Sequence, residues 1–432
     1  MKLTSIDLSK TNRFSKLFTD YIDSKAALAP FYDRFPKIDN FKEQIKEKQF
    51  SLANRQILCQ VLEEQYKDYE KKESLEQNLK SLARENTFTV TTGHQLNIFT
   101  GPLYFIYKIV TVINSCRQLS KAYPDYNFVP VYWMASEDHD FDEISYFWLN
   151  GQKHKWETEQ SGAVGRFMTD ELSKLCDEIP GMPELFKEAY QNYDSLADAG
   201  RCYVNALFGD QGLVVIDADN RQLKSLFTSV IEDDVLNNTS YELVEKATAD
   251  LQKQGYSTQV NPRKINFFYL SKGFRERIEN DNEAFKVLNS DISLSKQEIL
   301  TSISNTPEKY SPNVILRPLY QEMILPNLAY VGGPSEVAYW FQLKSVFDHY
   351  KVTFPILMPR NFVAIINDLV NAKIKKIGFK LDELFRPQYM LEKDIALKTT
   401  DKKIELNGQR KQLMALFDGI QRQAEDIDKT LV

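Results

Sequence analysis

A short run of acidic residues around one histidine is the stretch of this sequence best suited to chemistry. Within seven positions the chain carries five carboxylates and one imidazole: Glu137, Asp138, His139, Asp140, Asp142 and Glu143. Carboxylates and imidazole commonly transfer protons in catalysis. Like charges this close repel one another, so a fold has reason to hold them together where a ligand, a cation or a basic partner offsets the charge. A solvated acidic loop without chemistry is the alternative.

The residues before the acidic run predict the element that positions it. Residues 129–135 are apolar, β-branched or aromatic, and Trp133 lies among them, as in a strand buried on both faces. In an open α/β sheet, ligands bind at the carboxyl ends of the strands. Ser136 and the acidic run would then lie at a binding edge.

A second polar loop is predicted at the end of the neighbouring strand, residues 87–92. Its glycine, proline and hydrogen-bonding positions are Gly93, His94, Gln95, Thr100, Gly101 and Pro102. A helix over 103–122 follows, carrying Tyr104 and Lys108, with Thr100 as its predicted N-cap. A helix start with free N–H groups can bind an anion. Each residue also has a purely structural interpretation, such as a turn glycine or a cap.

The sheet is predicted to resume over residues 311–320, and a second strand–glycine–helix unit follows. Gly332 and Gly333 would form the turn, and a helix over 335–350 would begin beside Glu336. A last strand over 354–360 would end at Arg360, a side chain suited to bidentate pairing with a carboxylate or phosphate. The further candidate ligand contacts in this part are Arg317, Asn327 and Tyr330.

Composition excludes several classes of protein. The 432 residues carry a net charge of −6, which argues against a general nucleic-acid binder. The first residues lack the apolar core of a signal peptide, and no apolar run reaches the roughly 20 residues that span a bilayer. The four cysteines are scattered without a CxxC pair, so free thiols and a cytoplasmic location are expected.

The sequence predicts five consecutive parts. They are a helical arm (1–86), the first half of an α/β core with a hairpin at 145–157 (87–221), a connective subdomain (222–310), the second half of the core (311–385) and the start of a coiled coil (386–432). The coiled coil is predicted from apolar residues spaced by four and three: Leu413, Phe417, Ile420, Ala424, Ile427 and Leu431. Its partner helix is expected either beyond this sequence, which we interpret as truncated, or from another subunit.

Five collinear stretches resemble one known family. They are TTGHQLNIFTGPLYFIYK, VPVYWMASEDHDFDEI, QVNPRKINFFYL, SPNVILRPLYQEMILPNLAYVGGPSEVAYWFQ and FPILMPR. Over about residues 85–360 the chain is similar to the bacillithiol biosynthesis cysteine-adding enzymes. The resemblance implies an α/β fold with a Rossmann-like, nucleotidyltransferase-type parallel sheet, an inserted connective subdomain and a C-terminal coiled coil that forms a homodimer.

The resemblance also implies a reaction, in which a cysteine ligase joins cysteine to the amine of glucosaminyl malate. By fold analogy ATP with Mg²⁺ would activate the cysteine carboxylate, and no tightly bound cofactor is expected. For the site, we expect Asp138, His139 or Asp140 to act as the base and Glu137 to hold the amine or sugar hydroxyls. The predicted anion contacts are Lys108, Arg317 and Arg360, and the predicted walls of the sugar site are Tyr104, Trp133 and Tyr330.

Two other functions fit parts of the sequence. A metal-dependent hydrolase or transferase would use His139 and its acidic neighbours as ligands. Consecutive residues of an extended segment point apart, however, and one loop rarely supplies four converging ligands. A coiled-coil binding module without catalysis would use the α/β core only for recognition, which leaves the polar loops at the strand ends unexplained.

Overall fold

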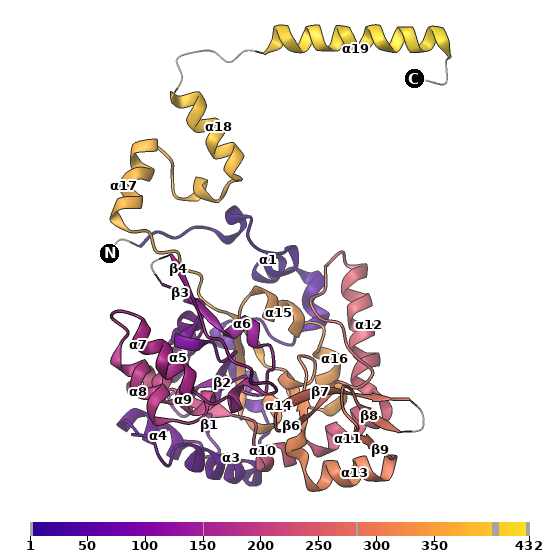
Figure 1. The fold of residues 1–432 in the computed structure, drawn as a ribbon. Coiled ribbons are helices and arrows are strands. Elements are labelled where there is room, and N and C mark those ends of the chain that lie inside the picture. Colours follow the sequence, from indigo (N-terminus) through magenta and orange to yellow (C-terminus); the bar gives the residue numbers. More distant parts are fainter. Residues whose placement is uncertain (1–2, 150, 282–283, 400–405, 429–432) are drawn as a thin grey trace. The chain divides into compact units, whose positions relative to one another are not determined.

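The computed structural model describes residues 3–149, 151–281, 284–399 and 406–428 (Figure 1). Two compact units divide the chain. The larger unit comprises residues 15–363 and holds every predicted site residue. The smaller unit comprises residues 1–14 and 364–432.

A five-stranded parallel sheet forms the centre of the larger unit. Its strands, in spatial order, are β12 (Ile356–Pro359), β11 (Asn327–Gly332), β1 (Thr87–His94), β2 (Asn127–Met134) and β5 (Val214–Asp217). Early and late parts of the chain therefore meet in one sheet (Figure 1). β-branched and aromatic residues fill these strands, and nearly all of their side chains are buried, as expected where helices cover both faces. The predicted α/β fold with a Rossmann-like parallel sheet is confirmed.

The elements between the first strands also follow the prediction. Helix α5 (Tyr104–Ala122) connects β1 to β2, which lie parallel with Gly93 opposite Trp133. The predicted hairpin forms from β3 (Tyr146–Leu149) and β4 (Gln152–Lys155). Helices α7 (Asp170–Glu178), α8 (Glu184–Asn192) and α9 (Leu196–Phe208) then lead to β5.

Helices near the N-terminus cover both edges of this sheet. They are α1 (Lys16–Ile22), α2 (Phe41–Glu47), α3 (Leu52–Gln65) and α4 (Glu73–Ser81). At one edge the Tyr21 hydroxyl donates to the carbonyl of Leu357 in β12 at 2.7 Å. At the other edge Val215 of β5 donates its N–H to the Tyr66 hydroxyl at 2.7 Å. Backbone groups that an edge strand would leave unpaired are thereby satisfied.

A second sheet, which is antiparallel, lies between β5 and β11 in the sequence. Its strands, in spatial order, are β10 (Tyr310–Pro312), β6 (Phe267–Ser271), β7 (Phe274–Asn280), β8 (Phe285–Val287) and β9 (Ser293–Leu294). Helices α10 (Arg221–Ser225), α11 (Thr228–Asn237) and α12 (Thr239–Lys253) precede it, and α13 (Lys296–Asn305) lies between β9 and β10. The sequence predicted a connective subdomain over residues 222–310 but did not reveal this sheet.

Two predicted elements are wrong. Residues 311–320 do not resume the parallel sheet, because β10 pairs antiparallel with β6 and residues 317–324 form helix α14 (Arg317–Ile324) with Pro318 in its first turn. The single helix predicted over 335–350 is two helices, α15 (Pro334–Trp340) and α16 (Lys344–Tyr350).

Asp234 gives the larger unit a pH-dependent stability. This carboxylate on α11 is fully buried and accepts hydrogen bonds from the Ser240 hydroxyl and the Asn266 N–H. Burial raises its pKa from 3.8 to about 6. Because the folded state then binds more protons than the unfolded state between these values, stability falls as the pH rises from about 4 to about 6, by about 3 kcal/mol. The free energy of unfolding of the wild type, measured with urea, should therefore fall by about 3 kcal/mol relative to that of Asp234→Asn between pH 4 and pH 7. A difference between the two proteins that does not change with pH would contradict the raised pKa of Asp234.

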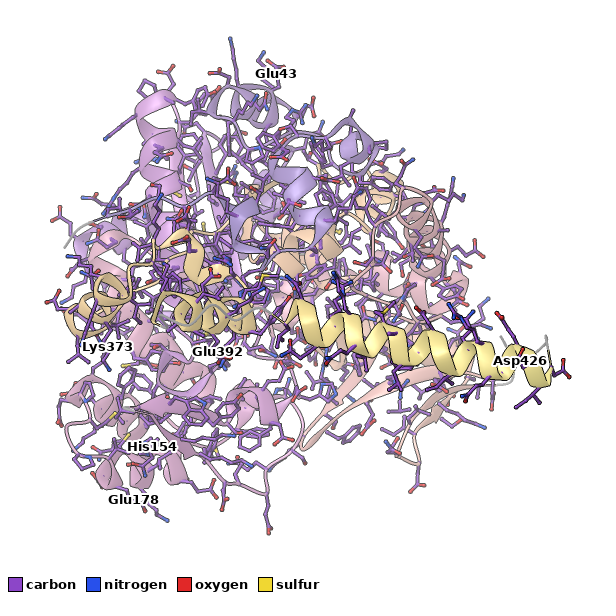
Figure 2. All side chains as sticks on the ribbon, turned by 90° about the horizontal axis from the view of Figure 1, so that it is seen from above. Glu43, His154, Glu178, Lys373, Glu392 and Asp426 are labelled. Atoms are coloured by element: carbon purple, nitrogen blue, oxygen red, sulfur yellow. The ribbon has the colours of Figure 1, made fainter. Side chains whose placement is uncertain are left out.

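The smaller unit contains three helices near the C-terminus, α17 (Asp368–Ile377), α18 (Gln388–Thr399) and α19 (Asn407–Ile427). Figure 2 shows α19 with its side chains and labels Asp426 near its end. The apolar side chains of the predicted heptads Leu413, Phe417, Ile420 and Ile427 are exposed. Leu431 lies outside the described residues. Across the described part of the chain, the helices are all too short or too polar to cross a membrane.

Candidate active site

The carboxyl edge of the parallel sheet carries most of the predicted site residues, in two groups of opposite charge. The acidic half follows β2 and β5 and comprises Glu137, Asp138, Asp217 and Asp219 with their partners. The basic half surrounds the ends of β1, β11 and β12 and comprises Lys108, Arg317 and Arg360. The parallel register places His94, Met134 and Asp217 next to one another across β1, β2 and β5, which brings the polar loops together.

Glu137 forms a buried ion pair with Lys224 of α10. The Lys224 side chain is 1% exposed, and its ammonium also lies 3.4 Å from the carbonyl of Glu308. Burial raises the pKa of Glu137, and the charge of Lys224 opposes that rise. Lys224 could not be recognised from the sequence, because nothing in the residues around it indicates an ion pair with a residue 87 positions away.

Two further acidic residues complete the acidic half. The Ser136 hydroxyl donates to Asp217 at 2.5 Å, and Arg166 forms a bidentate pair with Asp219 at 2.8 and 2.9 Å. Burial and the neighbouring charge of Asp219 raise the pKa of Asp217. Neither acid caps the following helix, because the side chain of Asn220 is the N-cap of α10.

Asp138 and His139 contact residues from two other segments. The Gln95 amide donates to Asp138 at 3.2 Å, and Arg275 of β7 lies with Nη1 2.8 Å from His139 Nδ1. Burial would raise the pKa of Asp138, but the charge of Arg275 and the hydrogen bonds from the Gln95 amide and the His139 backbone N–H outweigh burial and lower that pKa well below its usual range. Asp138 is therefore a carboxylate suited to binding a cation and weak as a base.

Asp140 has a local structural contact. Its carboxylate accepts the Glu143 N–H at 3.4 Å and caps the short helix α6 (Phe141–Ile144). Among the predicted bases, Asp140 is therefore the one whose presence is best explained by a structural role, as the N-cap of α6.

In the basic half, Lys108 is engaged within the protein. Its buried ammonium lies 2.7 Å from Glu336 and donates to the carbonyl of Gly93 at 2.5 Å. Glu336 also accepts from the Tyr330 hydroxyl at 2.6 Å and from the Gly333 N–H at 2.8 Å. Lys108 was predicted to bind a substrate anion. In the structure its ammonium instead links α5 to β1 and α15 through Gly93 and Glu336.

Arg317, at the start of α14, has an unused hydrogen-bond donor. Its guanidinium lies 5.6 Å from the ring of Trp133 and 5.7 Å from that of Tyr330. Nη1 donates to Gln321 at 3.1 Å and the Tyr339 hydroxyl is a further partner of the guanidinium, whereas the buried Nη2 has no hydrogen-bond partner among the described residues. A Cβ placed on Gly93 would meet the Tyr330 hydroxyl at 3.4 Å, Arg317 Nη1 at 3.7 Å and Trp133 at 3.8 Å, so Gly93 lies directly beside this cation. A buried donor without a partner is costly, and a ligand carboxylate or phosphate would satisfy it.

His94 and Arg360 both lie close to Tyr104, the first residue of α5. The His94 ring centroid is 5.4 Å and the Arg360 guanidinium 5.0 Å from the Tyr104 ring. Burial and the charge of Lys108 lower the pKa of His94 to about 4, so this imidazole is neutral at neutral pH. No side chain caps the start of α5, although the Phe105 N–H donates to the carbonyl of Pro102 at 2.9 Å. The remaining N–H groups of the first turn and Arg360 together suit a phosphate.

The loop before α5 differs from the prediction in one respect. The N-cap is Leu103 and not Thr100, because Phe99 and Thr100 form part of a short 3₁₀ turn with positive φ angles of 51° and 68°. Gly101 follows at φ 59° and ψ −138°, and Pro102 precedes the helix. These strained residues turn the chain sharply between β1 and α5.

Gly101→Ala is expected to destabilise the fold by more than 2 kcal/mol and to disturb this loop. An added Cβ would lie 2.3 Å from the Asn97 Cβ, at a φ that L-residues avoid. Gly151→Ala is the matched control, since it also has positive φ but meets nothing within 4 Å, and about 1 kcal/mol is expected there. Equal losses for the two variants in thermal unfolding would refute the close approach.

Asn327 does not belong to the site, and its predicted ligand contact is wrong. It lies at the amino end of β11, fully buried. Its amide donates to Glu322 at 2.6 Å, and its carbonyl accepts from Thr91 at 2.8 Å. Glu322 in turn pairs with buried Lys48 at 3.3 Å, so this network holds the far end of the sheet to the N-terminal helices.

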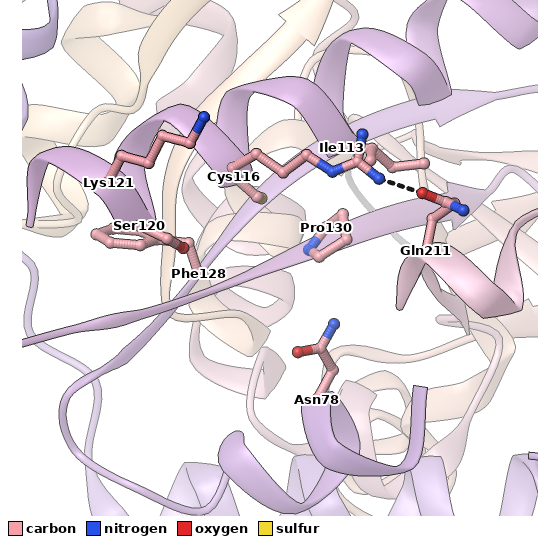
Figure 3. Close-up of a pocket in the computed structure, with 9 residues that line it drawn as sticks. Asn78, Ile113, Cys116, Ser120, Lys121, Phe128, Pro130 and Gln211 are labelled. Carbon is pink, nitrogen blue, oxygen red and sulfur yellow. Dashed lines mark hydrogen bonds between the residues drawn. The ribbon is translucent and has the colours of Figure 1, made fainter. Parts of the chain in front are cut away.

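A hollow of about 400 Å³ lies away from the carboxyl edge (Figure 3). Phe128 and Pro130, from the first half of β2, and Cys116, from the second half of α5, line it. Figure 3 shows Asn78 and Gln211 on the other elements around it. None of the predicted site residues lines this hollow, so it is separate from the candidate site.

The described residues contain no group of side chains that could together bind a metal ion. Nowhere in residues 3–149, 151–281, 284–399 and 406–428 do three side chains of His, Cys, Asp or Glu converge as metal ligands. The acidic residues after β2 instead turn to separate partners, Glu137 to Lys224 and Asp138 to Gln95. The geometry thus gives the metal-dependent alternative no support.

Comparison with known proteins agrees with this architecture. Residues 1–361 match the family model described as bacillithiol biosynthesis BshC, N-terminal Rossmann-like domain. A protein of Flavobacterium psychrophilum named "Putative cysteine ligase BshC" is 45% identical over the whole chain and 83% of its own length. Proteins with the same name from Flavobacterium johnsoniae (43% identical, the whole chain and 83% of that protein) and Cytophaga hutchinsonii (41%, 99% and 82%) are similar too. The chain therefore belongs to the BshC family of bacillithiol biosynthesis.

Proposed function

We propose that this protein is a cysteine ligase of bacillithiol biosynthesis, which joins the carboxylate of cysteine to the amine of glucosaminyl malate. The observation that carries the proposal is the division of one sheet edge into an acidic and a basic half. Glucosaminyl malate has the matching distribution of charge, with an ammonium on the sugar and two carboxylates on the malate. The names of the relatives supply the reaction class.

In this proposal the malate carboxylates bind in the basic half. The unused Nη2 of Arg317 and the guanidinium of Arg360 are the donors suited to them. Tyr104, which is 44% exposed, supplies apolar surface for the sugar, whereas the predicted walls Trp133 and Tyr330 are buried and pack near the Arg317 guanidinium.

The sugar ammonium binds in the acidic half. The lowered pKa of Asp138 keeps it a carboxylate, which stabilises the ammonium before it loses its proton. Lys224 fixes Glu137 and Asp217 fixes Ser136, so these two side chains are preorganised hydrogen-bonding groups for the sugar hydroxyls next to the ammonium. Preorganised polar groups of this kind reduce the cost of reaching the transition state.

Binding measurements test this arrangement. Calorimetric titration of the protein with glucosaminyl malate and with a methyl glucosaminide lacking the malate should differ by at least 100-fold in Kd. Two charge-assisted contacts to carboxylates account for a difference of about 3 kcal/mol. Equal affinities would contradict the assignment of the basic half.

We also propose ATP, with Mg²⁺ as the counter-ion of its phosphates, as the activating co-substrate. The uncapped start of α5 and Arg360 are the groups that would hold a phosphate. The test uses cysteine labelled with ¹⁸O in its carboxylate. If an adenylate forms, one ¹⁸O per turnover appears in AMP; if an acyl phosphate forms, it appears in phosphate. Turnover without label transfer to either product would refute activation by ATP.

The predicted homodimer and cytoplasmic location complete the proposal. The exposed apolar side chains of α19, including Leu413, Phe417 and Ile420, suit a second helix of a coiled coil. All four cysteines are free thiols, as expected for a reducing compartment. Sedimentation should give the mass of a dimer, and Phe417→Glu should shift it toward the monomer.

A further inference from the structure

Two histidines lie on the two loops that meet at the candidate site, and each has one ring nitrogen fixed by a neighbour. His94 ends β1, and its Nδ1 lies 3.0 Å from the carbonyl oxygen of Gln95. A carbonyl oxygen only accepts hydrogen bonds, so Nδ1 of His94 must carry the proton. Nε2 of the neutral ring is then a lone pair that accepts.

His139 is held in the opposite way. Its Nδ1 lies 2.8 Å from Nη1 of Arg275. A guanidinium only donates, so Nδ1 of His139 must be the acceptor and Nε2 must carry the proton. Asp138 Oδ1 is 3.7 Å from the same Nδ1, beyond hydrogen-bonding distance, so the guanidinium decides the tautomer.

Arg275 is fixed in this position by the inserted sheet. From β7 it donates through Nε to the Ser311 hydroxyl at 3.0 Å and through Nη2 to the carbonyl of Pro312 at 3.1 Å. Its guanidinium stacks 3.9 Å from the ring of Phe268, which also packs against His139 at 5.3 Å. The charges that face it are Glu137, Asp138 and Asp219, all negative. These carboxylates stabilise the positive charge of Arg275. A proton on Nδ1 of His139 would point at the N–H donors of this guanidinium, which is unfavourable.

Several hydrogen bonds join the two loops, among them bonds from the side-chain amides of Gln95 and Asn97 to Glu143. Gln95, whose carbonyl orients His94, donates its side-chain amide at 3.2 Å to Asp138, the residue before His139. Among the described residues, neither histidine has a hydrogen-bond partner at Nε2. The two free Nε2 atoms therefore belong to one connected polar network and remain for a ligand.

We infer that the site holds its two histidines in opposite neutral tautomers, with His94 Nε2 as a hydrogen-bond acceptor and His139 Nε2–H as a donor, and that Arg275 is the positioning residue for His139. The inference rests on the proposed function for its ligand groups. His94 would receive a hydroxyl or ammonium of the substrate, and His139 would donate to a carboxylate or carbonyl oxygen. This assignment removes His139 from the candidate bases, because the lone pair of its neutral ring, on Nδ1, accepts the hydrogen bond from Arg275.

Nitrogen NMR of the histidine side chains tests the inference without any turnover. This chain has four histidines, so its ¹⁵N-histidine-labelled form gives four ring systems in a long-range ¹⁵N–¹H correlation spectrum. His94→Gln and His139→Gln assign the two site rings. At neutral pH the wild type should show a protonated Nδ1 for His94 and a protonated Nε2 for His139. The same tautomer in both rings, or an imidazolium at His139, would overturn the inference.

Variants at Arg275 separate its role from a general effect on folding. In Arg275→Met the His139 ring should lose its single tautomer and show averaged ring-nitrogen shifts, while His94 stays unchanged. Arg277→Met, on the same strand but exposed, should leave both rings as in the wild type. An unchanged His139 in Arg275→Met would refute the positioning role. Since the spectra need no substrate, a wrong substrate assignment would leave these results intact, whereas an inactive protein with the expected tautomers would count against the proposed function alone.

Discussion

Lys224→Met is expected to lower the free energy of unfolding by about 3–5 kcal/mol and to abolish ligase activity. The variant leaves the buried carboxylate of Glu137 without its cation, and an unpaired buried charge costs about this much. Glu137 would then take up a proton, because burial already raises its pKa. Urea unfolding at neutral pH measures the first effect, and product formation measures the second.

The double variant Glu137→Gln/Lys224→Met separates the two effects. Removing both charges should restore stability to within about 1–2 kcal/mol of the wild type, because a neutral pair carries no unpaired charge. Activity should stay absent if Glu137 contacts the substrate. Lys253→Met breaks an exposed pair with Asp250 and should cost less than about 1 kcal/mol. A double variant as unstable as Lys224→Met would show that packing, and not the unpaired charge, dominates.

Arg317→Gln is expected to lower kcat/KM for glucosaminyl malate by about 100- to 1000-fold, mostly through KM. The change removes a buried cation whose Nη2 is reserved for a ligand in our account, and losing such a charged contact costs about 3–4 kcal/mol. Arg317→Lys should lie between, because lysine keeps the charge but not the planar pair of donors. Steady-state kinetics with varied glucosaminyl malate give both parameters.

A substrate without the malate provides the decisive control for Arg317. If the guanidinium binds the malate carboxylates, Arg317→Gln should change kcat/KM for a methyl glucosaminide by less than about threefold. Arg84→Gln, at an exposed position, should leave both substrates unaffected. An equal loss on both substrates would place Arg317 in folding or in another step.

The fold could largely be predicted, because its strongest signals are local. The strand over 87–92, the helix over 103–122 and the strand over 129–135 have clear periodicity and turn residues, and all three form near the predicted positions. The antiparallel sheet was missed because β8 and β9 have only three and two residues, too few to show alternation. Residues 311–320 were misread because apolar residues before Arg317-Pro318 suit a strand as well as a helix start.

The site could be predicted only in outline. Carboxyl ends of parallel strands meet at one edge, so loops at Gly93, Glu137 and Gly332 could be brought together from the sequence. Which side chains pair could not be predicted, since Lys224 and Arg275 reach Glu137 and His139 over 87 and 136 residues. A lysine at the position of Lys108 suits a contact with an anionic ligand, and only the structure shows that its charge is already paired with Glu336.

Mass spectrometry of the reaction product tests the central claim most directly. The full-length protein would be incubated with isotope-labelled cysteine and glucosaminyl malate, with and without ATP and Mg²⁺. We predict a product heavier than glucosaminyl malate by labelled cysteine minus water, with fragmentation that places an amide between the cysteine carboxylate and the sugar amine. We expect it only when ATP is present, and Lys224→Met should not form it. A wild-type protein that binds glucosaminyl malate but forms no such amide in either mixture would contradict the account.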